Sequence, residues 1–124
     1  MCIRDSITDV GRYDLAILAT GLRPNVEIAA EAGVEAGRTG AIRVDEHMET
    51  NLPGVYAAGD CTEATHLVTG RPAYIPLGTT ANKMGRVAGA NAAGRRERFG
   101  GVVGTAIVSI FGMGVGFSLS LIHI

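Results

Sequence analysis

The residue best placed to do chemistry in this sequence is Asp60, which follows Gly59 at the end of a short apolar run, Val55–Ala58. Turn residues, Asn51–Gly54, precede that run, so the order predicts a turn, a buried strand and a strand end. In open α/β sheets, ligands bind in the crevice outside the carboxyl ends of the strands. We therefore expect the Asp60 carboxylate to accept hydrogen bonds from a polyol or a ribose, and Gly59 to let the ligand come close. A plain turn without a ligand is the alternative for the same two residues.

A helix is predicted soon after this strand end. Small and apolar residues recur at helical spacing from residue 77 to residue 94, and Gly78–Thr80 supplies the start. The amino end of a helix presents free N–H groups and a partial positive charge, which favour negative charge on a ligand. Because a glycine inside a helix costs roughly 1 kcal/mol against alanine, we expect Gly85 and Gly89 to pack closely against a sheet.

Two stretches of the chain resemble the FAD-dependent pyridine nucleotide-disulfide oxidoreductases. Gly54–Asp60, with Thr50 before it, looks like the second flavin fingerprint of that superfamily. Ile75–Gly89 is similar to its coenzyme A-disulfide reductase, NADH oxidase and NADH peroxidase branch. The resemblance covers residues 14–117, nearly all of the chain.

The resemblance implies cofactor-binding residues and no catalytic residue in this sequence. Asp60 would hold the ribitol of FAD, and the start of the helix would meet the pyrimidine edge of the flavin, where reduction places negative charge. Gly21, after the apolar run Tyr13–Ala19, would lie on the nicotinamide side. The cofactor-binding residues expected on this basis are Gly59, Asp60, Leu77, Gly78, Thr79 and Gly21.

The same resemblance implies an activity for a longer parent protein. Such an enzyme passes hydride from NAD(P)H to FAD and then, through a cysteine outside this sequence, to a disulfide such as coenzyme A disulfide, or to oxygen or peroxide. We expect the parent to be a homodimer. Since no Gly-x-Gly-x-x-Gly opening a βαβ unit occurs here, we expect the 124-residue chain alone to be inactive and to bind flavin weakly or not at all.

The fold class predicted is α/β, as a fragment of a Rossmann-like FAD- and NAD(P)-binding flavoprotein with the start of an α+β interface domain. Residues 7–25 would end the NAD(P)-binding domain, 26–98 would form the carboxy-terminal half of the FAD-binding domain, and 99–118 would begin the dimerisation domain. The remaining elements predicted from periodicity are buried strand 13–19, helix 26–33, strand 40–45, polar loop 62–73, and strands 105–111 and 115–117.

The two ends of the chain are expected to be adapter-derived. Codons for Met1–Ser6, read as their reverse complement, encode Leu-Ser-Leu-Ile-His, and the chain ends in Leu119–Ile124. One inverted-repeat DNA, similar to the transposon end used to build sequencing libraries, explains both ends. Residues 1–6 and 119–124 therefore carry no biology under this interpretation.

Composition excludes several kinds of partner. The net charge of −1 gives no electrostatic reason to bind nucleic acid or a membrane surface. Two cysteines without a CxxC motif favour neither a disulfide framework nor a zinc site, which predicts a cytoplasmic setting. We expect Cys61 to be non-catalytic, His47 to be a surface residue rather than a base, and His66 to bind no metal. Residues 100–122 lack charge, but their glycines favour two strands over a membrane span.

Two alternatives stay open. A thioredoxin-reductase-like or ferredoxin-reductase-like flavoenzyme shares the Gly-Asp-Cys fingerprint, although its helix start would differ from Pro76–Thr80. A non-enzymatic small membrane or interaction protein is the alternative from another class, and it requires both termini to be genuine.

Overall fold

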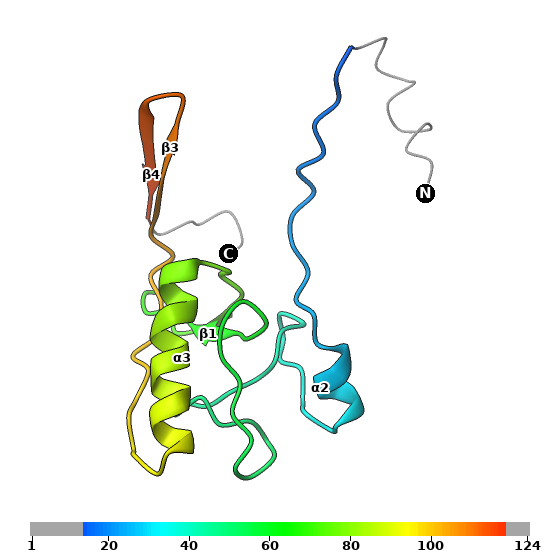
Figure 1. The fold of residues 1–124 in the computed structure, drawn as a ribbon, viewed down its shortest axis with the longest axis vertical. Helices are drawn as coiled ribbons and strands as arrows, with labels where there is room; N and C mark the ends of the chain where they lie inside the picture. Colours follow the sequence, from blue (N-terminus) through cyan, green and yellow to red (C-terminus); the bar gives the residue numbers. More distant parts are fainter. Residues whose placement is uncertain (1–13, 119–124) are drawn as a thin grey trace.

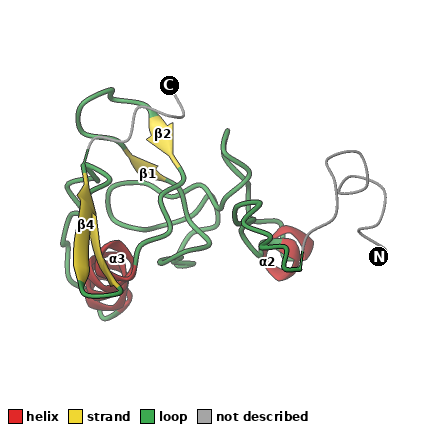
Figure 2. Ribbon diagram, turned by 90° about the horizontal axis from the view of Figure 1, so that it is seen from above, coloured by secondary structure: helices red, strands yellow, loops and turns green. Residues whose placement is uncertain are grey.

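The computed structural model describes residues 14–118, so the predictions for residues 1–13 and 119–124 lie outside the described residues. A short helix and a long helix lie on opposite sides of an irregular, loop-rich centre (Figures 1 and 2). In chain order, the elements are α2 (Glu27–Glu31), β1 (Ala64–Thr65), β2 (Pro72–Ala73), α3 (Gly78–Ala92), β3 (Ala106–Ile110) and β4 (Met113–Phe117). Helix α2 confirms the helix expected within residues 26–33.

Helix α3 confirms the main helical prediction and carries one wall of the core. It begins after Leu77, whose backbone is extended, and Gly94 follows it in the left-handed region with φ of 84°. Its inner face buries Met84, Ala88 and Asn91, which lie three or four residues apart and therefore on one side of the helix. The core cluster consists of Met48, Ala64, Met84, Ala88 and Val102.

The expectation that Gly85 and Gly89 pack closely is wrong. Both glycines are exposed, and a Cβ atom added at either position would meet no atom within 4 Å in the described residues. Core contact on α3 comes instead from Met84 and Ala88, each one position before a glycine. The helix therefore presents Gly85 and Gly89 to solvent in this chain.

The strands predicted at residues 40–45 and at Val55–Ala58 are present only as single β-bridges. Ile42 pairs with Ala36 and with Thr62, while Tyr56 pairs with Glu49. Val55–Ala58 was expected to be buried, but it is half-buried and Val55 is 41% exposed. Within the described residues, the backbone hydrogen bonds of this run all go to the 48–52 segment, so only one edge of the run is paired.

The expected polar loop 62–73 is wrong, because this stretch is ordered and partly buried. Strands β1 and β2 pair antiparallel, with Ala64 opposite Ala73 and Thr65 opposite Pro72. The Glu63 N–H donates to the Ile42 carbonyl at 3.0 Å, which ties the stretch to the centre. Three polar residues of this stretch are buried, namely Thr62, Glu63 and His66.

The strand predicted at 13–19 is also wrong over its described part. Residues 14–23 run extended and exposed, with Leu15 77% and Ile17 83% accessible. Figure 1 shows this segment rising beyond α2 with no other segment alongside it. An apolar run becomes a strand only when a neighbouring backbone accepts and donates its hydrogen bonds, and the described residues provide none here.

The strands predicted near the carboxyl end are confirmed as a hairpin. Strands β3 and β4 pair antiparallel over five positions, from Ala106 opposite Phe117 to Ile110 opposite Met113. The hairpin projects past the start of α3 (Figure 1), and its side chains are almost all exposed, Phe111 by 98%. No helix within residues 14–118 combines the length and the apolar character that crossing a membrane requires.

Candidate functional site

Gly59 and Asp60 lie in a turn directly after the half-buried run Val55–Ala58. Gly59 has φ of 94°, a conformation that favours glycine, and Asp60 is exposed. The Thr62 hydroxyl lies 2.8 Å from the Gly59 carbonyl and donates to it, which closes the turn. The Asp60 carboxylate makes no hydrogen bond or ion pair among those found in residues 14–118, so its oxygens face solvent.

The start of α3 presents unused donors. Leu77 makes no side-chain cap, and the first backbone bond into the helix runs from Ala81 N–H to the Leu77 carbonyl at 2.9 Å. Gly78 and Thr79 are exposed, and a Cβ atom at Gly78 would meet nothing within 4 Å. This helix end can therefore accept a ligand atom with partial negative charge.

The two features lie next to each other. A Cβ atom built on Gly59 would come 3.8 Å from the Cβ atom of Ala81, in the first turn of α3. One turn further along, the Thr62 hydroxyl lies 3.3 Å from the Met84 sulfur. The β1–β2 hairpin makes this possible, because it returns the chain to the turn that it left after Asp60.

Tyr74 is a neighbour of this surface that the sequence analysis did not single out. Desolvation raises the pKa of the Tyr74 hydroxyl, and coulombic interactions with Asp60 and Cys61 raise it further. A tyrosine hydroxyl is protonated at neutral pH, so Tyr74 offers a hydrogen-bond donor in this part of the chain. The sequence signal that could have identified Tyr74 is its position directly before Ile75, where the family-like stretch begins, and it follows the end of β2.

Gly21 is not brought to the other predicted site residues. It lies in the extended segment that precedes α2, with φ of 89°, and a Cβ atom there would meet nothing within 4 Å. Figures 1 and 2 place that segment on the α2 side of the molecule, opposite α3. The structure thus groups Gly59, Asp60 and the start of α3, and leaves Gly21 apart.

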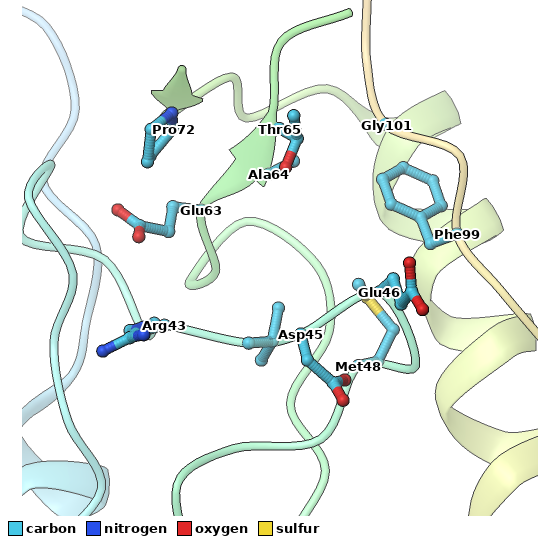
Figure 3. A pocket seen from close by; sticks show the side chains of 11 residues that line it. Arg43, Asp45, Glu46, Met48, Glu63, Ala64, Thr65, Pro72, Phe99 and Gly101 are labelled. Atoms are coloured by element: carbon cyan, nitrogen blue, oxygen red, sulfur yellow. The ribbon is translucent and has the colours of Figure 1, made fainter. Parts of the chain in front are cut away.

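A separate groove of about 450 Å³ opens between the 43–48 segment and the chain after α3. In Figure 3, Phe99 and Glu46 lie on the α3 side of the groove, whereas Arg43, Glu63 and Pro72 lie across from them. The Glu63 carboxylate accepts hydrogen bonds from the Thr39 hydroxyl and N–H at 2.9 and 3.3 Å. None of the predicted site residues lines this groove.

The other reactive side chains have structural partners. The Cys61 thiol is half-buried and lies 3.7 Å from the Ala58 carbonyl. His66 is buried, and its Nδ1 accepts from the Thr69 N–H at 3.3 Å. His47 was expected at the surface, yet its side chain is only 18% exposed, because Nδ1 contacts the Glu97 carbonyl. In residues 14–118, no three His, Cys, Asp or Glu side chains gather as a metal site would require.

A Gly-Asp turn after an apolar run, close to the amino end of a helix, is typical of ligand-binding sites in α/β proteins. The chain belongs to the pyridine nucleotide-disulphide oxidoreductase family, whose pattern it matches over residues 5–94. This confirms the family resemblance found in the sequence.

Individual relatives agree with this assignment. The chain is 50% identical over 112 residues to the NAD(P)H sulfur oxidoreductase (CoA-dependent) of Pyrococcus furiosus, covering 89% of this chain and 25% of the relative. It is 43% identical over 103 residues to an NADH oxidase of Methanocaldococcus jannaschii, covering 83% and 23%. The chain therefore spans about a quarter of the length of these relatives.

A solved structure supports the predicted fold class. The NAD-dependent persulfide reductase from A. fulgidus superposes with a TM-score of 0.77 at 49% identity, covering 81% of this chain and 18% of that one. The α/β, Rossmann-like assignment is confirmed by this likeness. The described residues contain two two-stranded sheets and not the central parallel sheet that such folds have.

Proposed function

We propose that this chain is the part of an FAD-dependent NAD(P)H oxidoreductase that holds the ribitol and the pyrimidine edge of the flavin. One observation carries the proposal: Gly59, the neighbour of the exposed Asp60, lies against the first turn of α3, and the start of that helix has no side-chain cap. The carboxylate accepts hydrogen bonds from ribitol hydroxyls. Leu77, Gly78 and Thr79 present backbone N–H groups to the flavin ring.

The residues present fit a flavin in size and chemistry. Open space at Gly78 lets a planar ring approach the helix end without a side chain in between. Tyr74, whose pKa is raised by desolvation and by Asp60, adds a hydroxyl donor. When bound, FAD would supply the redox chemistry, while these residues orient it and stabilise negative charge on its pyrimidine edge.

The same proposal assigns three parts of the chain to different domains of the longer enzyme. Residues 7–25 end the NAD(P)-binding domain, with Gly21 on the nicotinamide side, 26–98 complete the FAD-binding domain, and 99–118 begin a dimerisation domain. The exposed apolar hairpin supports the last assignment, because such side chains are suited to the interface of a homodimer. A cytoplasmic setting is consistent with the free thiol of Cys61.

The acceptor we propose is a sulfur compound, namely coenzyme A disulfide or a related persulfide. The P. furiosus relative, whose name specifies sulfur and coenzyme A, is 50% identical to this chain, against 43% for the M. jannaschii NADH oxidase. Oxygen or peroxide is the second candidate. NADH consumption by the full-length enzyme should be faster with coenzyme A disulfide than with oxygen, and the reverse order would favour the oxidase.

The flavin surface can be tested on the chain itself by NMR. Because the sequence lacks the glycine-rich turns that bind pyrophosphate, we expect weak binding, with Kd on the order of 1 mM. Added FAD should shift the amides of Gly59, Asp60, Gly78 and Thr79 before others. Asp60→Asn should reduce these shifts severalfold, whereas Asp14→Asn, at an exposed carboxylate in the extended segment, should not.

Two outcomes of this NMR titration would contradict the flavin assignment, and a third would contradict only the expected affinity. Shifts centred on the groove between Phe99 and Arg43, or equal shifts in both variants, would refute the flavin assignment. Stoichiometric FAD in the purified chain would instead refute the expected weak binding while leaving the site in place.

A further inference from the structure

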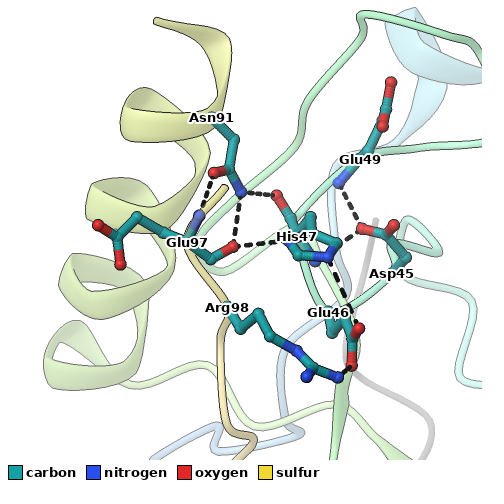
Figure 4. A network of polar contacts seen from close by, with 7 residues as sticks. All are labelled: Asp45, Glu46, His47, Glu49, Asn91, Glu97 and Arg98. Carbon is teal, nitrogen blue, oxygen red and sulfur yellow. Dashed lines mark hydrogen bonds and ion pairs between the residues drawn. The ribbon is translucent and has the colours of Figure 1, made fainter. Parts of the chain in front are cut away.

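Asn91, near the carboxyl end of α3, uses its whole side-chain amide to hold two other segments. It is 6% exposed, and its Nδ2 donates to the His47 carbonyl at 2.7 Å and to the Glu97 carbonyl at 2.9 Å. Its Oδ1 accepts from the Glu97 N–H at 2.6 Å. Figure 4 shows the amide between these groups. Only an amide supplies two donors and one acceptor in this space.

His47 closes the same contact from the other side. Its Nδ1 lies 2.7 Å from the Glu97 carbonyl, and because a carbonyl can only accept, Nδ1 carries the proton. Both lone pairs of that carbonyl are therefore used, one by Asn91 and one by His47. The second ring nitrogen, Nε2, faces the Glu46 carboxylate at 3.6 Å, and Arg98 pairs with the same carboxylate.

The turn that carries His47 is itself fixed. Asp45 Oδ1 accepts from the His47 and Glu49 N–H groups at 2.8 and 2.9 Å. The Phe99 N–H donates to the Glu46 carbonyl at 2.7 Å, and the Phe99 ring packs against the core. The segment 97–99 is thus held by α3 on one side and by the 45–49 turn on the other.

This segment leads directly into the β3–β4 hairpin. In residues 14–118, β3 and β4 contact each other and no other helix or strand. The direction of the hairpin is therefore set by its stem alone. Past the 97–99 segment, the stem has a second attachment at Val102, which exchanges backbone bonds with Thr65 and Leu67 at 2.9 and 2.8 Å.

We propose that Asn91, His47 and the 97–99 backbone form a latch that fixes the direction in which the hairpin leaves the α/β part, with Asn91 as its positioning residue. The latch is held by polar contacts, and residues 95–98, which belong to or adjoin it, are exposed. Helix α3, in contrast, is anchored in the core by Met84 and Ala88. Segments held by few apolar contacts open at lower free energy than the core does. The latch therefore opens while α3 stays folded, and the stem is then held at Val102, which is buried in the core cluster.

The decisive variant is Asn91→Asp in the full chain. The change keeps the size of the side chain and the acceptor for the Glu97 N–H. It removes both donors, however, and sets the second carboxylate oxygen against the His47 and Glu97 carbonyl oxygens. Amide hydrogen exchange at Glu97 and Phe99 should become at least about tenfold faster, while exchange at Val87 and Ala88 in α3 stays within about twofold. Residual dipolar couplings of β3–β4 should fall relative to those of α3.

Asn82→Asp is the matched control, since Asn82 is an exposed residue of the same helix away from the latch. It should leave exchange at Glu97 and Phe99 and the hairpin couplings unchanged. If Asn91→Asp prevents folding, His47→Ala removes only one donor and should give a smaller effect in the same direction. Equal acceleration throughout α3, or hairpin couplings unchanged in both latch variants, would overturn the proposal.

Discussion

Met84 offers the sharpest test of where the stability of this chain resides. Its side chain is 1% exposed and lies at the centre of the core cluster, whereas Met113 in β4 is 63% exposed. Met84→Ala leaves a cavity that the surrounding Met48, Ala64 and Val102 can fill only in part. Deletions of this kind cost about 2–5 kcal/mol, and we expect the same range here.

The hydroxyl next to the Met84 sulfur adds little to this cost. Thr62 has one hydroxyl proton, and the Gly59 carbonyl at 2.8 Å competes for it with the sulfur at 3.3 Å. Because the oxygen is closer and the better acceptor, the hydroxyl stays paired when the sulfur is removed. The predicted loss therefore comes from the cavity and not from an unsatisfied polar group.

Urea unfolding followed by helical circular dichroism measures the effect. Met84→Ala should lower the midpoint strongly, and Met113→Ala, the same change at an exposed site, should alter stability by less than about 0.5 kcal/mol. Equal losses for the two variants would show that the hairpin contributes as much as the core. A wild-type signal that declines without a cooperative step would show that the five core residues do not hold the chain together.

Two further predictions concern α3 and the 45–49 turn. Since Gly89 is helical and has open space around its Cα atom, Gly89→Ala should raise stability by about 0.5–1 kcal/mol in urea unfolding, and a loss would reveal a hidden close contact. The hydrogen bond from Arg98 holds the pKa of Glu46 below its ordinary value of 4.5, so this contact stabilises the fold above that value and is lost as the pH falls through the lower, folded-state pKa. Glu46→Gln should flatten the acid limb of the urea midpoint plotted against pH, and an unchanged limb would contradict this assignment.

Local patterns in the sequence were sufficient for the helices and the hairpin. Helix α3 follows from the spacing of Met84 and Ala88, and the β3–β4 hairpin follows from two apolar runs around Gly112. These elements satisfy their backbone hydrogen bonds mainly within themselves or with the next strand. Their existence therefore depends little on distant residues.

Elements that depend on distant partners were not predictable in the same way. The 14–19 segment has the composition of a strand, but it lacks an adjacent backbone in the described residues. Glu63 is buried because Thr39, 24 positions earlier, binds its carboxylate, and Asn91 because His47 lies 44 positions earlier. No short-range pattern encodes such pairs.

The candidate site shows both outcomes. The sequence placed Gly59 and Asp60 at a strand end and Gly78 at a helix start. The structure has the helix start, whereas Gly59 and Asp60 follow a run that forms only a single bridge, at Tyr56. What joins them is the β1–β2 hairpin, in a stretch that the sequence analysis predicted to be a polar loop. The proximity of Gly59 to Ala81 could therefore not be derived from the residues alone.

The exposed β3–β4 hairpin also determines how readily molecules of this chain associate with one another in solution. A ribbon with Ile107, Phe111 and Phe117 open to water and no ionised group along its length has unsatisfied strand edges on both sides. The net charge of −1 supplies almost no long-range repulsion between molecules. Colloidal stability is consequently low, and self-association at raised concentration is the behaviour that the chain's own surface dictates.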